Sequence, residues 1–117
     1  MFTVTIERRP GYLLATASGP ADVDENCSGI VFVGEMLRRS GIARLLFDMK
    51  NLTLQLGKAD ALEVISTLYA STPPLEKIAV LAPAGQSHGL VLEVARHRNI
   101  PAQEFAEVDE AEAWLRQ

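Results

Sequence analysis

Several features that mark common protein classes are missing from this chain of 117 residues. It has a single cysteine, Cys27, which excludes an intramolecular disulfide and fits a reducing compartment. The net charge is −4 and the sequence contains no basic stripe, so there is no electrostatic reason to expect nucleic-acid binding. No apolar run approaches the roughly 20 residues of a membrane-spanning helix, and the chain opens on a strand-like pattern rather than a secretion signal. These absences predict a soluble cytoplasmic protein.

The composition is sufficient for one hydrophobic core. At 48% hydrophobic residues, the chain is expected to fold as a single globular domain spanning residues 1–117. Its two histidines, His88 and His97, and its cysteine are too scattered to suggest a metal site. We therefore expect neither a metal nor a cofactor.

Apolar runs and turn residues predict an α/β fold in the order β-β-α-β-α-β-α-β-α. The expected strands are residues 2–9, 11–19, 43–48, 76–83 and 102–108, and the expected helices are residues 25–40, 58–71, a segment starting at Ser87, and 109–117. Short, almost entirely apolar strands such as residues 43–48 are typical of parallel sheets covered by helices. A tight turn at residues 9–11 should make the first two strands antiparallel. The prediction is a mixed, mostly parallel five-stranded sheet with four helices.

Polar residues at the ends of the expected helices predict their caps. Asp22 or Asp24 can cap the first helix, and Gly41 can end it in the left-handed conformation. In the last helix, Asp109 followed three residues later by Glu112 resembles a capping box.

Three stretches carry a resemblance to a known family: "LLFDMKNL" (residues 45–52), "KIAVLAP" (77–83) and "FAEVDEAEAWL" (105–115). Together with the order of elements, they resemble the STAS domains (sulfate transporter and anti-sigma-factor antagonist), and more closely their SpoIIAA-like branch. The third stretch is the most specific, and the order of elements matches over essentially the whole chain. The resemblance implies a non-enzymatic domain that binds a protein or a small molecule.

Asp48 closes the expected third strand, and three roles are open to it: a catalytic group, a ligand anchor, or a cap for the following turn. Ligands of open α/β sheets collect beyond the carboxyl ends of parallel strands. No second acid, histidine or metal ligand lies near Asp48 in the sequence, so the pattern favours a turn anchor at the rim of that face. In phosphorylated members of the resembled family a serine follows this aspartate. Here Met49, Lys50 and Asn51 follow, and Thr53 is the nearest hydroxyl, which argues against a phosphorylation switch.

The stretch "GQSHG" (residues 85–89) matches the Gly-x-Ser-x-Gly elbow of α/β-hydrolases. The other members of a triad are missing, because His88 adjoins Ser87 and His97 lies about 15 Å further along the same expected helix. Ser87 is therefore interpreted as a helix N-cap, and no catalytic residue is assigned. The amides of this loop could still hold a small anion.

An excess of apolar residues suggests a binding surface. Four follow one another from Ile30 to Val33, so one face of the helix can pack inward while the rest needs another cover. Leucines also alternate through residues 52–56, where a polar connection is usual. The candidate interface residues are Phe32, Val33, Met36, Leu52 and Leu56, and the candidate binding residues are Asp48, Asn51, Thr53, Leu54, Ser87 and His88.

Two hypotheses follow for the function. The first is a non-catalytic STAS-like module that forms a homodimer and regulates a protein partner. The alternative is a carrier or sensor of a small apolar or anionic ligand, held between the first helix, residues 52–56 and the loop at residues 85–89.

Overall fold

The computed structural model describes residues 1–54, 58–82 and 95–117. Its elements are β1 (Thr3–Arg9), β2 (Tyr12–Ala21), α1 (Val23–Ser40), β3 (Arg44–Leu54), α2 (Lys58–Ser71), β4 (Lys77–Leu81), β5 (Ala102–Phe105) and α4 (Val108–Leu115). Residues 95–97, just before β5, are helical. The expected helix from Ser87 otherwise lies outside the described residues.

The strands form one sheet in the order β1-β2-β3-β4-β5. β1 is antiparallel to β2, and the remaining neighbours are parallel. Gly11, at a φ of 87°, allows the tight turn between β1 and β2, because glycine adopts positive φ without a steric penalty. The predicted mixed sheet and its strand directions are confirmed.

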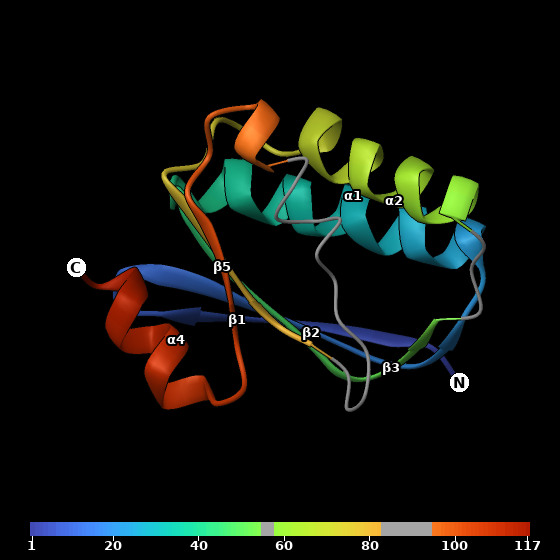
Figure 1. Ribbon diagram of the computed structural model, residues 1–117, viewed down its shortest axis with the longest axis horizontal. Helices are drawn as coiled ribbons and strands as arrows, with labels where there is room; N and C mark the ends of the chain where they lie inside the picture. The colour runs from blue at the N-terminus through green and yellow to red at the C-terminus, as the bar shows by residue number, and fades with distance from the viewer. Residues whose placement is uncertain (55–57, 83–94) are drawn as a thin grey trace.

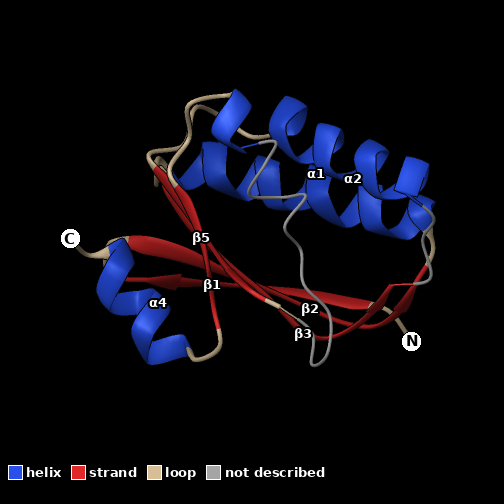
Figure 2. Ribbon diagram, viewed as in Figure 1, coloured by secondary structure: helices blue, strands red, loops and turns tan. Residues whose placement is uncertain are grey.

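Helices cover the two faces of the sheet unequally (Figures 1 and 2). α1 and α2 lie side by side over one face, here called the α1 face, and the shorter α4 lies against the other, the α4 face. Side chains alternate between the two, as the pleat of a strand requires. The core on the α1 face includes Leu13, Leu45, Phe47, Ile78 and Val80, and the core on the α4 face includes Tyr12, Leu46, Ala79, Leu81, Ala111 and Leu115.

Both ends of α1 follow the sequence prediction. The Asp22 carboxylate accepts a hydrogen bond from the Glu25 amide at 2.8 Å, and the Glu25 carboxylate accepts one from the Asp22 amide at 3.2 Å. Gly41 ends the helix at a φ of 69°. Of the four consecutive apolar residues in this helix, Ile30 and Val33 are buried, whereas Val31 is 48% exposed and Phe32 is 45% exposed.

β3 is longer than predicted and contains a bulge. Asp48 is opposite Thr16 and Asn51 is opposite Ser18, so Met49 and Lys50 together face a single residue of β2, Ala17. The strand then continues to Leu54. The expectation that the strand ends at Asp48 is therefore wrong, and residues 52–54 belong to the sheet rather than to a connection.

The predicted capping box of α4 is also wrong. Glu107 is the N-cap residue and makes no side-chain cap bond. Glu112 instead accepts a hydrogen bond from the Tyr12 hydroxyl at 2.8 Å, and this bond ties the helix to β2. Glu112 also pairs with Arg116 at 2.8 Å. Burial, and then the hydrogen bond to Glu112, raise the pKa of Tyr12 to about 12. Tyr12 therefore stays neutral at ordinary pH.

Candidate functional site

The bulge explains the role of Asp48 in the structure. The Asp48 Oδ1 accepts a hydrogen bond from the Lys50 amide at 3.1 Å, so the carboxylate satisfies a donor where the strand is irregular. This is the local backbone bond expected from the sequence, but it lies within a strand rather than in a turn at its end. Asp48 therefore supports the shape of β3.

The structure brings several candidate binding residues to one face. Asp48, Asn51 and Thr53 lie beside Thr16, Ser18 and Pro20 of β2, and their register places all three on the α4 face. Asn51 and Thr53 are exposed, and Asp48 is partly buried. The side chain of Leu54 is not described, and Ser87 and His88 lie outside the described residues.

The predicted apolar interface is only partly present on the surface. Phe32 is 45% exposed and Met36 is half-buried on the same side of α1. Val33 and Leu52 are 0% and 4% exposed, so both belong to the core and their assignment to a surface patch is wrong. Leu56 lies outside the described residues.

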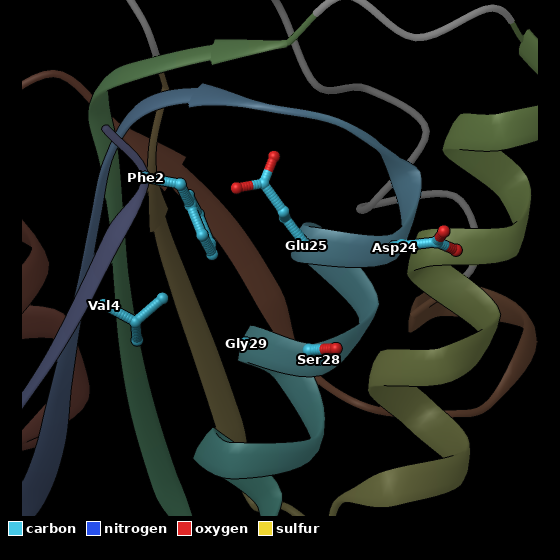
Figure 3. A pocket seen from close by; sticks show the side chains of 6 residues that line it. All are labelled: Phe2, Val4, Asp24, Glu25, Ser28 and Gly29. Carbon is cyan, nitrogen blue, oxygen red and sulfur yellow. The ribbon is translucent and has the colours of Figure 1, made fainter.

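An open groove runs between β1 and α1, and it is called the β1–α1 groove below. One part has a volume of about 460 Å³ and contains Phe2, Val4 and Gly29, with Phe2 and Val4 pointing from the strand toward the helix (Figure 3). The adjoining part has a similar volume, about 460 Å³, and shares Val4 with the first. Its other apolar residues are Ile6, Leu13, Phe32 and Met36. The floor is therefore apolar from Phe2 to Ile6.

The two ends of the β1–α1 groove carry opposite charges. Asp24 and Glu25, from the first turn of α1, lie at the end next to Phe2. Arg8 and Arg39 lie at the end next to Met36. Arg39 pairs with Glu35 at 3.0 Å, and the hydrogen bonds from Arg39 and then Arg38 lower the pKa of Glu35.

Two of these charges are available for a further contact. Within the described part of the chain, neither Asp24 nor Arg8 has an ion-pair partner, and both side chains are exposed. They lie at opposite ends of the β1–α1 groove.

β1 also presents an open backbone edge. It pairs with β2 through all of its residues, and no other strand among the described residues lies on its outer side. An unpaired edge carries a row of free N–H and C=O groups that can extend a sheet. The groove floor thus lies beside a strand that can accept another strand.

Sequence reasoning missed the contribution of β1 to this site. The alternation in residues 2–9 already places Phe2, Val4, Ile6 and Arg8 on one face. The signal was present, but the position of β1 at the sheet edge and beside α1 depends on packing.

Other candidate chemistry is sparse among the described residues. They contain no group of three or more histidine, cysteine, aspartate or glutamate side chains that could hold a metal ion. The Cys27 Sγ lies 3.6 Å from the Thr67 hydroxyl, where it contributes to the contact between α1 and α2. None of the helices described is both long and apolar enough to cross a bilayer.

Comparison with known proteins identifies the fold. No family model matches the chain, and no curated protein sequence matches it. Among solved structures, an anti-sigma factor antagonist from Mycobacterium paratuberculosis superposes with a TM-score of 0.69 at 15% identity, over 100% of this chain and 96% of its own. A DUF3478-family protein with a SpoIIAA-like fold from Shewanella loihica PV-4 gives a TM-score of 0.65 at 19% identity, over 97% of this chain and 93% of its own.

The antagonist SpoIIAA in its unphosphorylated form gives a TM-score of 0.57 at 13% identity, over 97% of this chain and 96% of its own. The structural neighbours are thus anti-sigma factor antagonists and SpoIIAA-like proteins. The resemblance predicted from the sequence is confirmed at the level of the fold.

Proposed function

We propose that this chain is a non-catalytic, cytoplasmic STAS-like module that acts by binding another protein chain through the β1–α1 groove. The observation that carries the proposal is the combination of an apolar floor with an open strand edge beside it. A protein segment satisfies both, because its backbone can pair with β1 while alternate side chains enter the groove.

The neighbours of this fold support a role in regulation by protein contact. Two of them are described as anti-sigma factor antagonists, which are proteins defined by action on another protein. The identities are low, so the partner itself is not carried over to this chain.

The ligand-carrier alternative has no comparable support in the described residues. Leu52, which was expected to line its pocket, is buried in the core on the α1 face. The loop at residues 85–89 lies outside the described residues. Because the buried Leu52 is not available to line such a pocket, we propose protein binding as the function.

Capture with matched surface variants tests the proposal. Phe32→Asp places a charge on the groove floor, where an apolar contact cannot solvate it. Leu62→Asp makes the same chemical change on α2, at a side chain of similar exposure (41%) that does not line the groove. Three tagged baits are each incubated with extract: the wild type, Phe32→Asp and Leu62→Asp. The captured proteins are identified by mass spectrometry. Each captured protein is then purified and titrated against all three baits.

The proposal expects at least one purified partner that binds wild type and Leu62→Asp but is lost with Phe32→Asp. Equal binding to all three baits would place the partner surface elsewhere. The non-catalytic part is tested separately, and serine-directed fluorophosphonate labelling that disappears in Ser87→Ala would overturn it.

A further inference from the structure

We propose that the chain docked in the β1–α1 groove is a second copy of this protein, with the two β1 strands paired antiparallel about a two-fold axis at Thr5. The inference rests on the proposed function, because it names the occupant of the same groove. It would give a dimer with one continuous ten-stranded sheet.

The strand is suited to such pairing. β1 runs in unbroken register with β2 from Thr3 to Arg9, without a bulge that would twist its edge away. Proline and charged residues commonly protect exposed edges. Here Thr3–Ile6 carries neither, and the charges begin only at Glu7.

Two-fold symmetry brings the right surfaces together. When identical strands pair antiparallel, the axis is perpendicular to the sheet, so both α1 helices lie on the same face and run in opposite directions. The exposed Phe32 of each copy then faces the space between the two α1 helices. The contact between the two copies would cover the floor of both β1–α1 grooves.

The charge pattern of the groove is complementary to itself. Rotation by a half turn brings the basic end of one copy, with Arg8 and Arg39, to the acidic end of the other, with the partner's Asp24 and the partner's Glu25. Arg8 and Asp24, which have no ion-pair partner within the described part of one chain, would pair with each other twice. This complementarity favours a second copy over an unrelated chain.

The register follows from the same pattern. With the axis at Thr5, Val4 lies opposite the partner's Ile6, and Phe2 lies opposite the partner's Arg8. Apolar side chains then meet on the groove side, and each Arg8 reaches the end of the groove that contains Asp24. If one β1 strand were shifted by one residue relative to the other, its groove-facing side chains would lie on the opposite face of the sheet.

Native mass spectrometry and light scattering give the first test. The wild type is expected at twice the 12.7 kDa mass of one chain. Phe32→Asp should give a folded monomer with unchanged circular dichroism, and Leu62→Asp should remain a dimer. A wild type that stays monomeric at tens of micromolar overturns the second copy as occupant, and loss of a foreign partner in Phe32→Asp would still uphold the proposed function.

Charge reversal at exposed residues tests the antiparallel orientation of the two copies. This test does not require that the protein folds when Phe32 is replaced. Arg8→Glu alone and Asp24→Arg alone each place like charges together and should raise the dimer dissociation constant about tenfold or more. The double variant Arg8→Glu/Asp24→Arg should recover most of that loss. Two independent, additive losses without recovery would overturn the antiparallel arrangement.

Disulfide trapping tests the register. Opposite residues of antiparallel strands lie about 4.5–5.5 Å apart between Cα atoms, within the range of a disulfide. In a Cys27→Ser background, Thr5→Cys should therefore cross-link to its own copy. Thr3→Cys or Glu7→Cys alone should not, because each lies about 14 Å from its own copy at about 3.4 Å per residue. Mixing Thr3→Cys with Glu7→Cys should restore the cross-link. Self-linking at Thr3 or Glu7 without linking at Thr5 would overturn the axis at Thr5.

Discussion

Replacing Gly34 by alanine should destabilise the protein although alanine favours helices. Gly34 is buried in α1 where the helix crosses the end of α2. An added Cβ would lie 2.9 Å from the carbonyl carbon of Ser71, and closer still to its oxygen. The same oxygen accepts a hydrogen bond from Arg38 at 2.5 Å, so it cannot move away without weakening that contact.

The expected magnitude follows from two opposing effects. The higher helix propensity of alanine contributes about 1 kcal/mol in favour of folding. Overpacking against backbone atoms costs about 1–3 kcal/mol, and the weakened bond to Ser71 adds to that cost. The net loss of unfolding free energy should therefore be about 1–2 kcal/mol.

Gly29→Ala is the matched control in the same helix. Its added Cβ would meet the Val4 Cγ2 at 3.0 Å and the Phe2 Cζ at 3.1 Å, which are side-chain atoms at the open groove. They can shift, so the change in unfolding free energy should stay within about 0.5 kcal/mol of wild type or favour folding by the alanine effect. Urea titration measures both, with the m-value checked for two-state behaviour. If Gly34→Ala proved as stable as Gly29→Ala, the close approach of α1 and α2 would be wrong.

Three further predictions concern the core, the pH dependence and the first helix. Leu46→Ala should cost about 2–5 kcal/mol, because the side chain is fully buried under α4, and a loss below about 0.5 kcal/mol in urea would remove that segment from the core. Burial raises the pKa of both Tyr12 and Tyr69 from 10.0 to about 12, so their neutral forms stabilise the fold fully below pH 10 and this stability is lost as the pH rises through 12. The urea midpoint should fall over that interval in wild type and fall less in Tyr12→Phe/Tyr69→Phe, and equal slopes would contradict this assignment. Asp22→Ala should lower stability by about 1 kcal/mol through loss of the capping box, whereas Asp24→Ala, outside the box, should have a smaller effect in the same titration.

The bulge in β3 explains why the sequence predicted the order of elements along the chain but not the length of this strand. Phe47 and Leu52 both face the α1 side, yet they are five residues apart, and simple alternation places such residues on opposite faces. A change of phase in the apolar pattern resembles the end of a strand. The leucines after Asp48 were therefore interpreted as a connection.

The surface was harder to predict than the core. Ile30, Val31, Phe32 and Val33 have similar hydrophobicity, so the sequence does not reveal which of them points inward. The rotation of α1 in the packed structure places Gly34 against Ser71 and Phe32 beside β1. The groove depends on that rotation, and it could be found only once the helices were packed.

The extra residue in β3 also determines where the chain can change in length. Removing either Met49 or Lys50 would leave one residue opposite Ala17, and Leu52 would remain opposite Gly19 with its side chain in the core. A deletion between Arg44 and Asp48 would instead exchange the faces of Leu45 and Leu46 relative to the rest of the strand. Among natural relatives, single-residue insertions and deletions within this strand should therefore concentrate at positions 49 and 50. In engineering, removal of Lys50 would shorten β3 while Met49, which packs against the core on the α1 face, stays opposite Ala17.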